Sequence, residues 1–254
     1  MKKSMKKIQR LSILAVFVAP LMLSSNSVNA GTVLLSTGNG TGSYGYGFSS
    51  WGNFTAALDT ATGNQVTTTG NFNNLTQMLS YDSLFLDQRW TGGSLSSTEV
   101  SNITSYIGTG RRVVMMGENS SWTSWNNQVL GIVGGSFAGN ASSSTSASVS
   151  NEITNGAPEL SLPGAGSANG GTALYDQNFA TLWGLNVLTV LDVNVWQDSR
   201  WNTSNGGVFG TNVANWLAAD IEGSSPVPEP ATLALMGLGL AGLGFRKHRN
   251  KKAA

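Results

Sequence analysis

A nearly uninterrupted apolar run at residues 112–117 (RVVMMG) lies near the middle of this 254-residue sequence. Such a run predicts a β-strand that is buried on both faces, as in a parallel sheet covered by helices on each side. Further strand-like runs surround it in the sequence, and we expect strands at residues 33–37, 65–69, 83–87 and 188–192. A chain built in this way needs helical crossovers between its strands.

The intervening segments have the helical spacing that such crossovers require. Phe54, Ala57, Leu58 and Ala61 lie on one helical face. Further helices are expected where Ser96 and Glu99 form a capping box, at residues 122–133 and at residues 209–217. We therefore predict an α/β fold: a three-layer, mostly parallel, flavodoxin-like sheet with helices on both faces. The globular domain spans residues 31–220, with an insertion rich in Ser, Ala and Gly at about 138–172.

The composition of this domain removes several classes of function. Between residues 31 and 230 only four arginines oppose all 13 acidic residues, which gives a net charge of about −9 and predicts no nucleic-acid partner. The same region has no histidine, cysteine or lysine. Catalysis by Ser-His-Asp, Cys-His or Ser-Lys groups and zinc binding through imidazole or thiolate are therefore excluded, and we expect no catalytic residue and no bound metal or other cofactor.

The N-terminal 30 residues have the pattern of a secretory signal peptide. Five basic residues precede an apolar run at residues 11–23, and small residues end the segment at Ala30. We expect signal peptidase to cut between Ala30 and Gly31 after the export machinery has engaged the chain. The apolar run is too short to cross a bilayer.

The C-terminal segment contains an apolar run at residues 231–245, which is followed by five basic residues that would hold the tail in the cytoplasm. The triplet Pro228, Glu229 and Pro230 stands directly before this run. Triplet, apolar helix and basic end together resemble the PEP-CTERM sorting signal. The resemblance implies a linker at 221–227, a sorting signal at 228–254 and a single transmembrane helix at 231–245. It also implies a precursor anchored in the inner membrane, processing by an exosortase, and delivery to the cell surface or extracellular matrix of a Gram-negative bacterium.

The segment at residues 95–137 combines a capped helix, a buried strand and a second helix that ends in Gly-Gly-x-Phe. It resembles the class I glutamine amidotransferase-like superfamily, especially its ThuA-like members. Where active members of that superfamily have a nucleophilic cysteine after the central strand, this chain has Gly117, Glu118 and Asn119. The resemblance therefore implies the fold without glutaminase or protease activity.

Polar side chains follow three of the predicted strands, and parallel strands place their carboxyl ends at one edge of the sheet, where open α/β sheets bind ligands. Aromatic loop residues should lie near the same edge. Among them we expect Trp196 and Trp201 to be exposed in the polar loop that follows the strand at 188–192. The candidate ligand-binding residues are Tyr44, Tyr46, Asp87, Glu118, Asn119, Asp192, Asn194, Trp196, Asp198 and Trp201. The carboxylates could bind calcium or act as acid and base on a glycoside, and ordinary capping and hydration is the simpler interpretation.

These observations predict a noncatalytic surface protein that binds or organises exopolysaccharide in a biofilm matrix. Its eight tryptophans could stack on sugar rings if some of them are exposed. The alternative hypothesis is a carboxylate-dependent glycoside hydrolase that acts on the same polymer.

Overall fold

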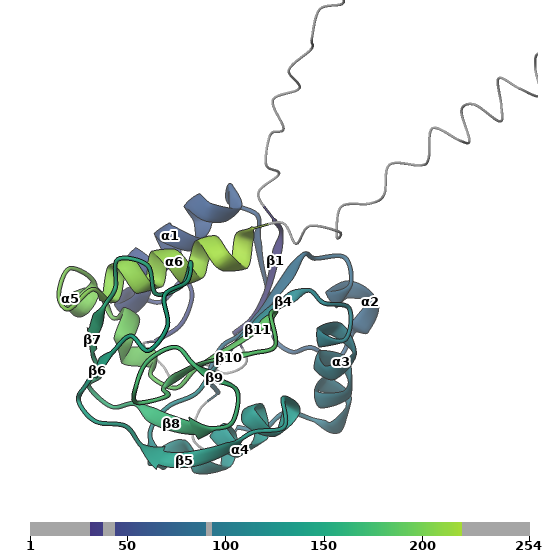
Figure 1. Ribbon diagram of the computed structural model, residues 1–254. Helices are drawn as coiled ribbons and strands as arrows, with labels where there is room; N and C mark the ends of the chain where they lie inside the picture. The colour runs from purple at the N-terminus through teal and green to yellow at the C-terminus, as the bar shows by residue number, and fades with distance from the viewer. Residues whose placement is uncertain (1–30, 38–43, 90–92, 220–254) are drawn as a thin grey trace, which may run out of the picture.

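A seven-stranded sheet forms the centre of the protein in a computed structural model that describes residues 31–37, 44–89 and 93–219 (Figure 1). In spatial order its strands are β2 (Val66–Thr69), β1 (Val33–Ser36), β3 (Ser83–Leu86), β4 (Arg112–Met116), β11 (Val187–Val190), β10 (Ala180–Trp183) and β9 (Thr172–Ala173). The first five are parallel, and β10 and β9 are antiparallel to their neighbours. The predicted mixed α/β fold with a mostly parallel sheet is confirmed.

Helices cover both faces of this sheet (Figure 1). The helices α1 (Gly52–Thr62) and α6 (Gly206–Ala218) pack on one face, together with strand residues such as Leu35 and Val114. The other face carries α2 (Leu75–Met78), α3 (Ser97–Ile107) and α4 (Thr123–Ile132), which pack on residues such as Leu34 and Val113. Neighbouring strand residues thus point to opposite cores, and this explains why the central strands are apolar without alternation.

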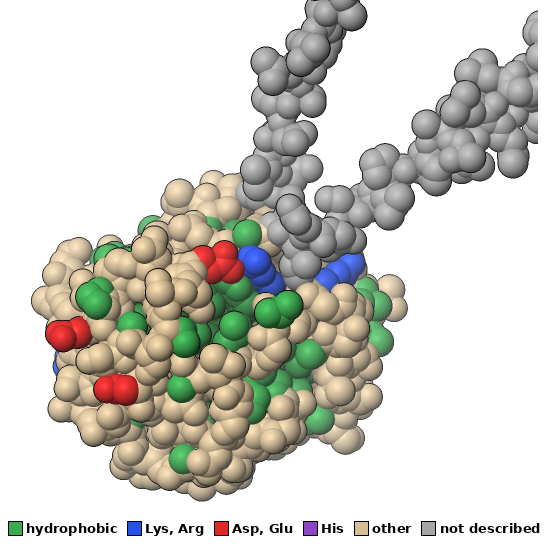
Figure 2. All heavy atoms as spheres, viewed as in Figure 1, with side chains coloured by type: hydrophobic (Ala, Val, Ile, Leu, Met, Phe, Trp, Pro, Cys, Tyr) green, Lys and Arg blue, Asp and Glu red, His purple; other side chains and the backbone are tan. Residues whose placement is uncertain are grey.

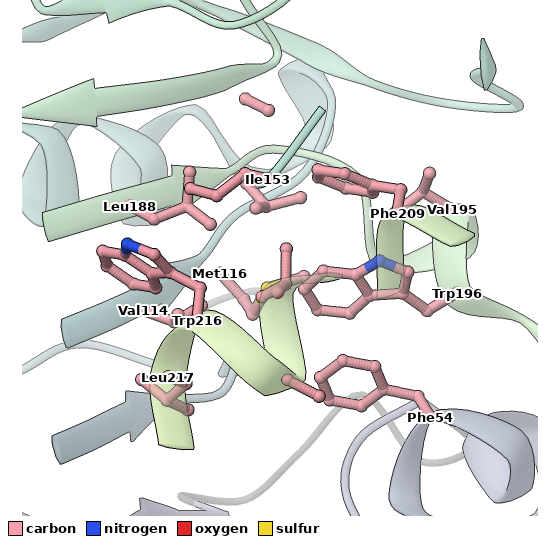
Figure 3. Close-up of a cluster of buried hydrophobic side chains, with 14 of the residues drawn as sticks. Phe54, Val114, Met116, Ile153, Leu188, Val195, Trp196, Phe209, Trp216 and Leu217 are labelled. Atoms are coloured by element: carbon pink, nitrogen blue, oxygen red, sulfur yellow. The ribbon is translucent and has the colours of Figure 1, made fainter. Parts of the chain in front are cut away.

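Aromatic rings dominate the core beneath α1 and α6 (Figure 3). Trp196 stacks on Phe54 with parallel rings 4.2 Å apart, and Trp51 meets Trp196 edge to face at 5.3 Å. The indole nitrogen of Trp51 donates a hydrogen bond to the carbonyl of Val193 at 2.8 Å. These contacts fix the short 3-10 helix η3 (Val193–Trp196) against the core, where the sequence had predicted an exposed polar loop after the last strand.

Helix α3 begins with the predicted capping box. The backbone amide of Glu99 donates to the Ser96 hydroxyl, and the Glu99 carboxylate accepts from the backbone amide of Ser96. Glu99 is also buried against Arg89, with which it forms an ion pair that the sequence did not predict. Burial alone would raise the pKa of Glu99, but hydrogen bonds from Arg89, Ser96 and Phe72 lower it below its usual value.

The expected insertion consists of short strands. The strands β5 (Ser136–Asn140) and β8 (Gly166–Asn169) form one antiparallel pair, and β6 (Ser144–Ser146) and β7 (Glu159–Ser161) form another. Strand β10 was not predicted. Its four residues (ATLW) carry no helix or strand period of their own, and pairing with β11 through the turn at Gly184 places it in the sheet.

The first and last described segments lie side by side, at the start of β1 and the end of α6 (Figure 1). The Gly31 amide donates a hydrogen bond to the Ala218 carbonyl at 2.9 Å. In the part of the chain that the structure describes, no helix combines the length and the hydrophobicity needed to span a bilayer. The predicted signal peptide at 1–30, the linker and the transmembrane segment at 231–245 lie outside the described residues.

Candidate functional site

Three carboxylates stand where three neighbouring strands end. Asp87, Glu118 and Asp192 follow β3, β4 and β11, whose last residues are aligned by the parallel register. Alternation along the strands directs all three toward the core beneath α1 and α6. All three residues are therefore almost fully buried, with exposed fractions of 1% for Asp87, 2% for Glu118 and 0% for Asp192.

Glu118 and Asp192 form a close pair across β4 and β11. One Glu118 oxygen accepts from the amide and side chain of Asn119 at 3.2 Å, and the other accepts from the backbone amide of Val193 at 3.0 Å. Asp192 accepts from the backbone amide of Asn194 at 2.8 Å. Burial raises the pKa of both groups, and the charge of Asp192 raises that of Glu118 further, so the pair favours a state in which it retains a proton near neutral pH.

The loop that carries Glu118 is held by a residue that sequence reasoning missed. Asn126, from α4, accepts from the Glu118 amide at 3.0 Å and donates to the Glu118 and Asn119 carbonyls. Gly117 fits this arrangement because a β-carbon there would lie only 2.6 Å from the Asn126 side-chain oxygen. The sequence signal that could have identified Asn126 is an asparagine on an otherwise apolar helix face.

Asp87 lies apart from this pair, under the loop that follows β1. The backbone amide of Gln88 donates to its carboxylate at 2.9 Å, and the backbone of Tyr46 faces the same group. A β-carbon on Gly45 would come within 2.3 Å of the carboxylate. Burial raises the pKa of Asp87 to about 8, more than these hydrogen bonds lower it.

The remaining predicted site residues are dispersed. Tyr44 and Tyr46 are partly buried beside α1, where the Tyr46 hydroxyl donates to Asp59 at 2.5 Å. Asp198 accepts from the Asn53 amide at 2.8 Å and thereby caps the first turn of α1. Within residues 31–37, 44–89 and 93–219, no group of three or more His, Cys, Asp or Glu side chains is placed to bind a metal ion. The expectation of no bound metal and the calcium alternative both stay predictions.

The prediction that Trp196 is an exposed loop residue is wrong. Its ring is fully buried in the aromatic core, so it cannot stack on a ligand from solvent (Figure 3). Trp201, in α5 (Asp198–Trp201), is only partly buried and lines a surface hollow of about 420 Å³. The sequence could not separate the two rings because both follow the same strand and both lie in a segment rich in polar residues.

A larger hollow, of about 510 Å³, adjoins the first one at Asn205, and we call the two together the polar groove. Its walls are mostly hydroxyl and amide side chains from the insertion and from α5 and α6. They include Ser144, Thr145, Ser161, Asp176, Gln177, Asn202 and Asn212. The Asp176 carboxylate accepts from the Thr145 hydroxyl and the Ser146 amide, and these bonds lower its pKa. The sequence placed only Trp201 here, because serine-rich segments without periodicity do not reveal a wall.

Charged side chains are sparse on the face of the molecule that Figure 2 draws. The few that it shows are scattered among hydrophobic side chains and the tan atoms of other side chains and the backbone. This matches a sequence in which only 11% of residues are charged.

Comparison with known proteins identifies the C-terminal segment. The model of the PEP-CTERM protein-sorting motif matches residues 226–249, so the chain carries this motif at its C terminus. The motif implies an exported protein that is anchored transiently in the membrane and processed by an exosortase. No curated protein shows significant sequence similarity to the chain.

Solved structures are similar to this protein at low sequence identity. The mmIFT52 N-terminal domain is 10% identical with a TM-score of 0.53, and the match covers 74% of this chain and 98% of that domain. A ThuA-like protein from Bacteroides uniformis ATCC 8492 is 12% identical with a TM-score of 0.44, covering 73% of this chain and 90% of that one. An exo-β-1,4-mannosidase from Opitutaceae bacterium strain TAV5 is 14% identical with a TM-score of 0.46, covering 75% of this chain but 37% of the mannosidase.

Proposed function

We propose that the exported body is a noncatalytic protein of the cell surface that binds exopolysaccharide through the polar groove. The observation that carries the proposal is the groove itself, in which hydroxyl and amide groups surround a partly exposed indole, Trp201. Sugars present many hydroxyl groups and flat apolar faces, and such walls can satisfy both. The sorting motif supports this function because it implies export of the body.

The charge of the groove favours a polymer with few negative groups. Glu159 and Asp176 line it, and the guanidinium of Arg200 lies at its wall, 3.4 Å from the Ser161 hydroxyl. A strongly anionic polysaccharide would meet two carboxylates for one cation, and the rest of the body is also acidic. Neutral exopolysaccharide is the favoured ligand.

Retention of the purified full chain on immobilised exopolysaccharide from the native host tests the proposal. Trp201→Ala and Asn205→Ala should each weaken retention several-fold, because one removes the indole and the other the amide that both hollows share. Trp122→Ala is the matched control, since Trp122 is also partly buried but lies outside the groove. A wild-type chain that binds none of the host polysaccharides would refute the proposal.

A carboxylate-dependent glycoside hydrolase is the second candidate function, and the Glu118–Asp192 pair favours it. Two neighbouring carboxyl groups with raised pKa values could supply an acid and a base. Their burial argues against it, because neither group lines the polar groove that a polymer could occupy.

Release of reducing ends from the same polysaccharide distinguishes the two functions. Under the hydrolase hypothesis, Glu118→Gln, Asp192→Asn and Asp87→Asn should each abolish release, whereas the exposed Glu152→Gln should not. A wild-type preparation that binds the polymer and releases no reducing ends would eliminate the enzyme and retain the binding protein.

A further inference from the structure

The edge of the sheet where β1, β3, β4 and β11 begin lies opposite the carboxylates and collects both ends of the body. Gly31 and Ala218 are joined there by a hydrogen bond of 2.9 Å. Figure 1 shows the start of β1 beside the end of α6. Any anchor that follows α6 therefore holds the body by this edge, which we call the anchor edge.

The most exposed large apolar side chain of the described residues stands at the anchor edge. Leu185 is 87% exposed, compared with 37% for Phe48, 39% for Leu79 and 41% for Val208. It occupies the turn between β10 and β11, next to Gly184 at φ +62°. The Asn186 side chain fixes this turn by donating to the carbonyls of Ile107 and Arg111 at 3.1 and 2.9 Å. Leu185 is thus presented to solvent by an ordered turn.

An apolar hollow of about 300 Å³ adjoins this turn. Its lining includes Ile107, Ile132, Val133, Leu182, Trp183 and Val187. Leu79 is at the same edge, since its carbonyl accepts from the Arg111 guanidinium at 2.6 Å. The anchor edge thus carries an exposed leucine beside an apolar hollow and, separately, a second exposed leucine, and the described residues cover neither of these leucines.

The charges at this edge nearly cancel. Arg112 lies 3.7 Å from Glu152, and Arg111 and Asp82 contribute one charge of each sign. Among the described residues the excess of acidic side chains therefore lies elsewhere, and this part of the body can approach a bilayer with little net repulsion.

The length of the following chain limits what the anchor edge can reach. About a dozen residues separate α6 from the apolar run at 231–245, and they span at most ~40 Å when fully extended. The sorting motif implies that this run anchors the precursor in the membrane. The anchor edge is then held within ~40 Å of the start of the membrane anchor.

We propose that the anchor edge docks on the lipid surface of the inner membrane while the precursor is anchored, with Leu185 inserted among the headgroups. The opposite edge of the sheet, where the parallel strands end, and the polar groove then face away from the membrane. The inference rests on the anchoring that the motif implies and not on the proposed glycan binding.

Site-specific fluorescence tests the proposal directly, because the chain has no cysteine and a single introduced one is labelled uniquely. The full chain is reconstituted in phosphatidylethanolamine–phosphatidylglycerol vesicles that contain a headgroup spin-labelled lipid. A polarity-sensitive probe at Leu185→Cys should be quenched several-fold more than one at Phe48→Cys. Phe48 is the matched control, since it is also apolar and exposed but lies beside Asp87 at the opposite edge.

A second variant keeps the test independent of the labelled position. A probe at Leu79→Cys should also be quenched, and adding Leu185→Asp should relieve that quenching. Equal quenching at positions 185 and 48, or a chain that does not float with the vesicles, would overturn the proposal. A change at position 185 that appears without lipid and grows with protein concentration would assign the edge to a second copy instead.

Discussion

Asp87 illustrates how the fold acts on a single carboxyl group. In the unfolded chain its pKa is about 4, and in the folded protein burial raises the pKa to about 8. Between these values the unfolded state releases its proton while the folded state retains it. The unfolded state then binds fewer protons, so the stability falls as the pH rises from about 4 to about 8.

Asp87→Asn should therefore remove part of this pH dependence. At pH 8 the variant is expected to have a free energy of unfolding about 1–3 kcal/mol higher than the wild type. The reason is that asparagine has no charge, whereas the wild-type carboxyl group at this pH must be protonated or be buried as an anion. At pH 4 the difference should vanish or reverse. Urea unfolding across this pH range measures both, with exposed Glu159→Gln as control. A variant that keeps the full wild-type slope would contradict the burial of Asp87.

Trp196 and Trp201 are only five positions apart, but we expect the first to contribute mainly to stability and the second mainly to binding. Trp196→Ala should lower the free energy of unfolding by about 3–5 kcal/mol, since a large buried ring leaves a cavity beside Phe54. Trp201→Ala should cost less stability and should weaken polysaccharide retention instead. Thermal unfolding and the retention assay on the two variants separate these effects, and equal loss of stability in both would show that Trp201 is also a core residue.

The N-terminus of α3 is stabilised by a capping residue within the same turn and by an ion pair with a residue outside the helix. Ser96→Ala removes one capping hydrogen bond and should cost about 1 kcal/mol. Arg89→Ala should cost about 3–5 kcal/mol, because it leaves the buried Glu99 without its cationic partner. Denaturant unfolding of both variants and of Arg89→Ala/Glu99→Gln tests this order. The double variant should recover part of the loss, and a double variant as unstable as Arg89→Ala would contradict the ion-pair explanation.

Elements with their own periodicity were predictable from sequence, and elements defined by distant partners were not. The buried run of β4 and the capping box of α3 carry their signals within a few residues. Strand β10 forms because it pairs with β11, and η3 is buried because Trp196 packs against Trp51 and Phe54. The site followed the same division. The strand ends located Asp87, Glu118 and Asp192, but the burial of these side chains depends on distant segments that fold over them, such as the loop after β1 over Asp87, and the walls of the polar groove depend on the insertion.

At the scale of the whole molecule, the first and last described segments are in contact with each other. The hydrogen bond from Gly31 to Ala218 ties the first residue after the predicted leader to the end of the last helix. Thr32 ties the start of β1 to the turn before β3, since its amide and hydroxyl both donate to Asp82 at 2.8 Å. The predicted leader cut and the end of the last described helix therefore meet at one edge of the sheet, and the polar groove lies at a distance from it.

This junction gives a prediction about Gly31, which is buried although it begins the body. A β-carbon at position 31 would lie 2.8 Å from the Ala218 carbonyl oxygen, so Gly31→Ala must displace the end of α6 or break the hydrogen bond. We expect a loss of about 1–3 kcal/mol in the free energy of unfolding, in the range for overpacking a fitted site. Gly131→Ala is the matched control: a β-carbon there meets nothing within 4 Å, and alanine in the last turn of α4 should leave the stability unchanged or raise it slightly. Hydrogen exchange of the last turn of α6 should quicken in Gly31→Ala alone, because the two ends are coupled through this contact. If both glycine variants gained stability and α6 exchanged at the wild-type rate, the two ends of the body would be independent of each other.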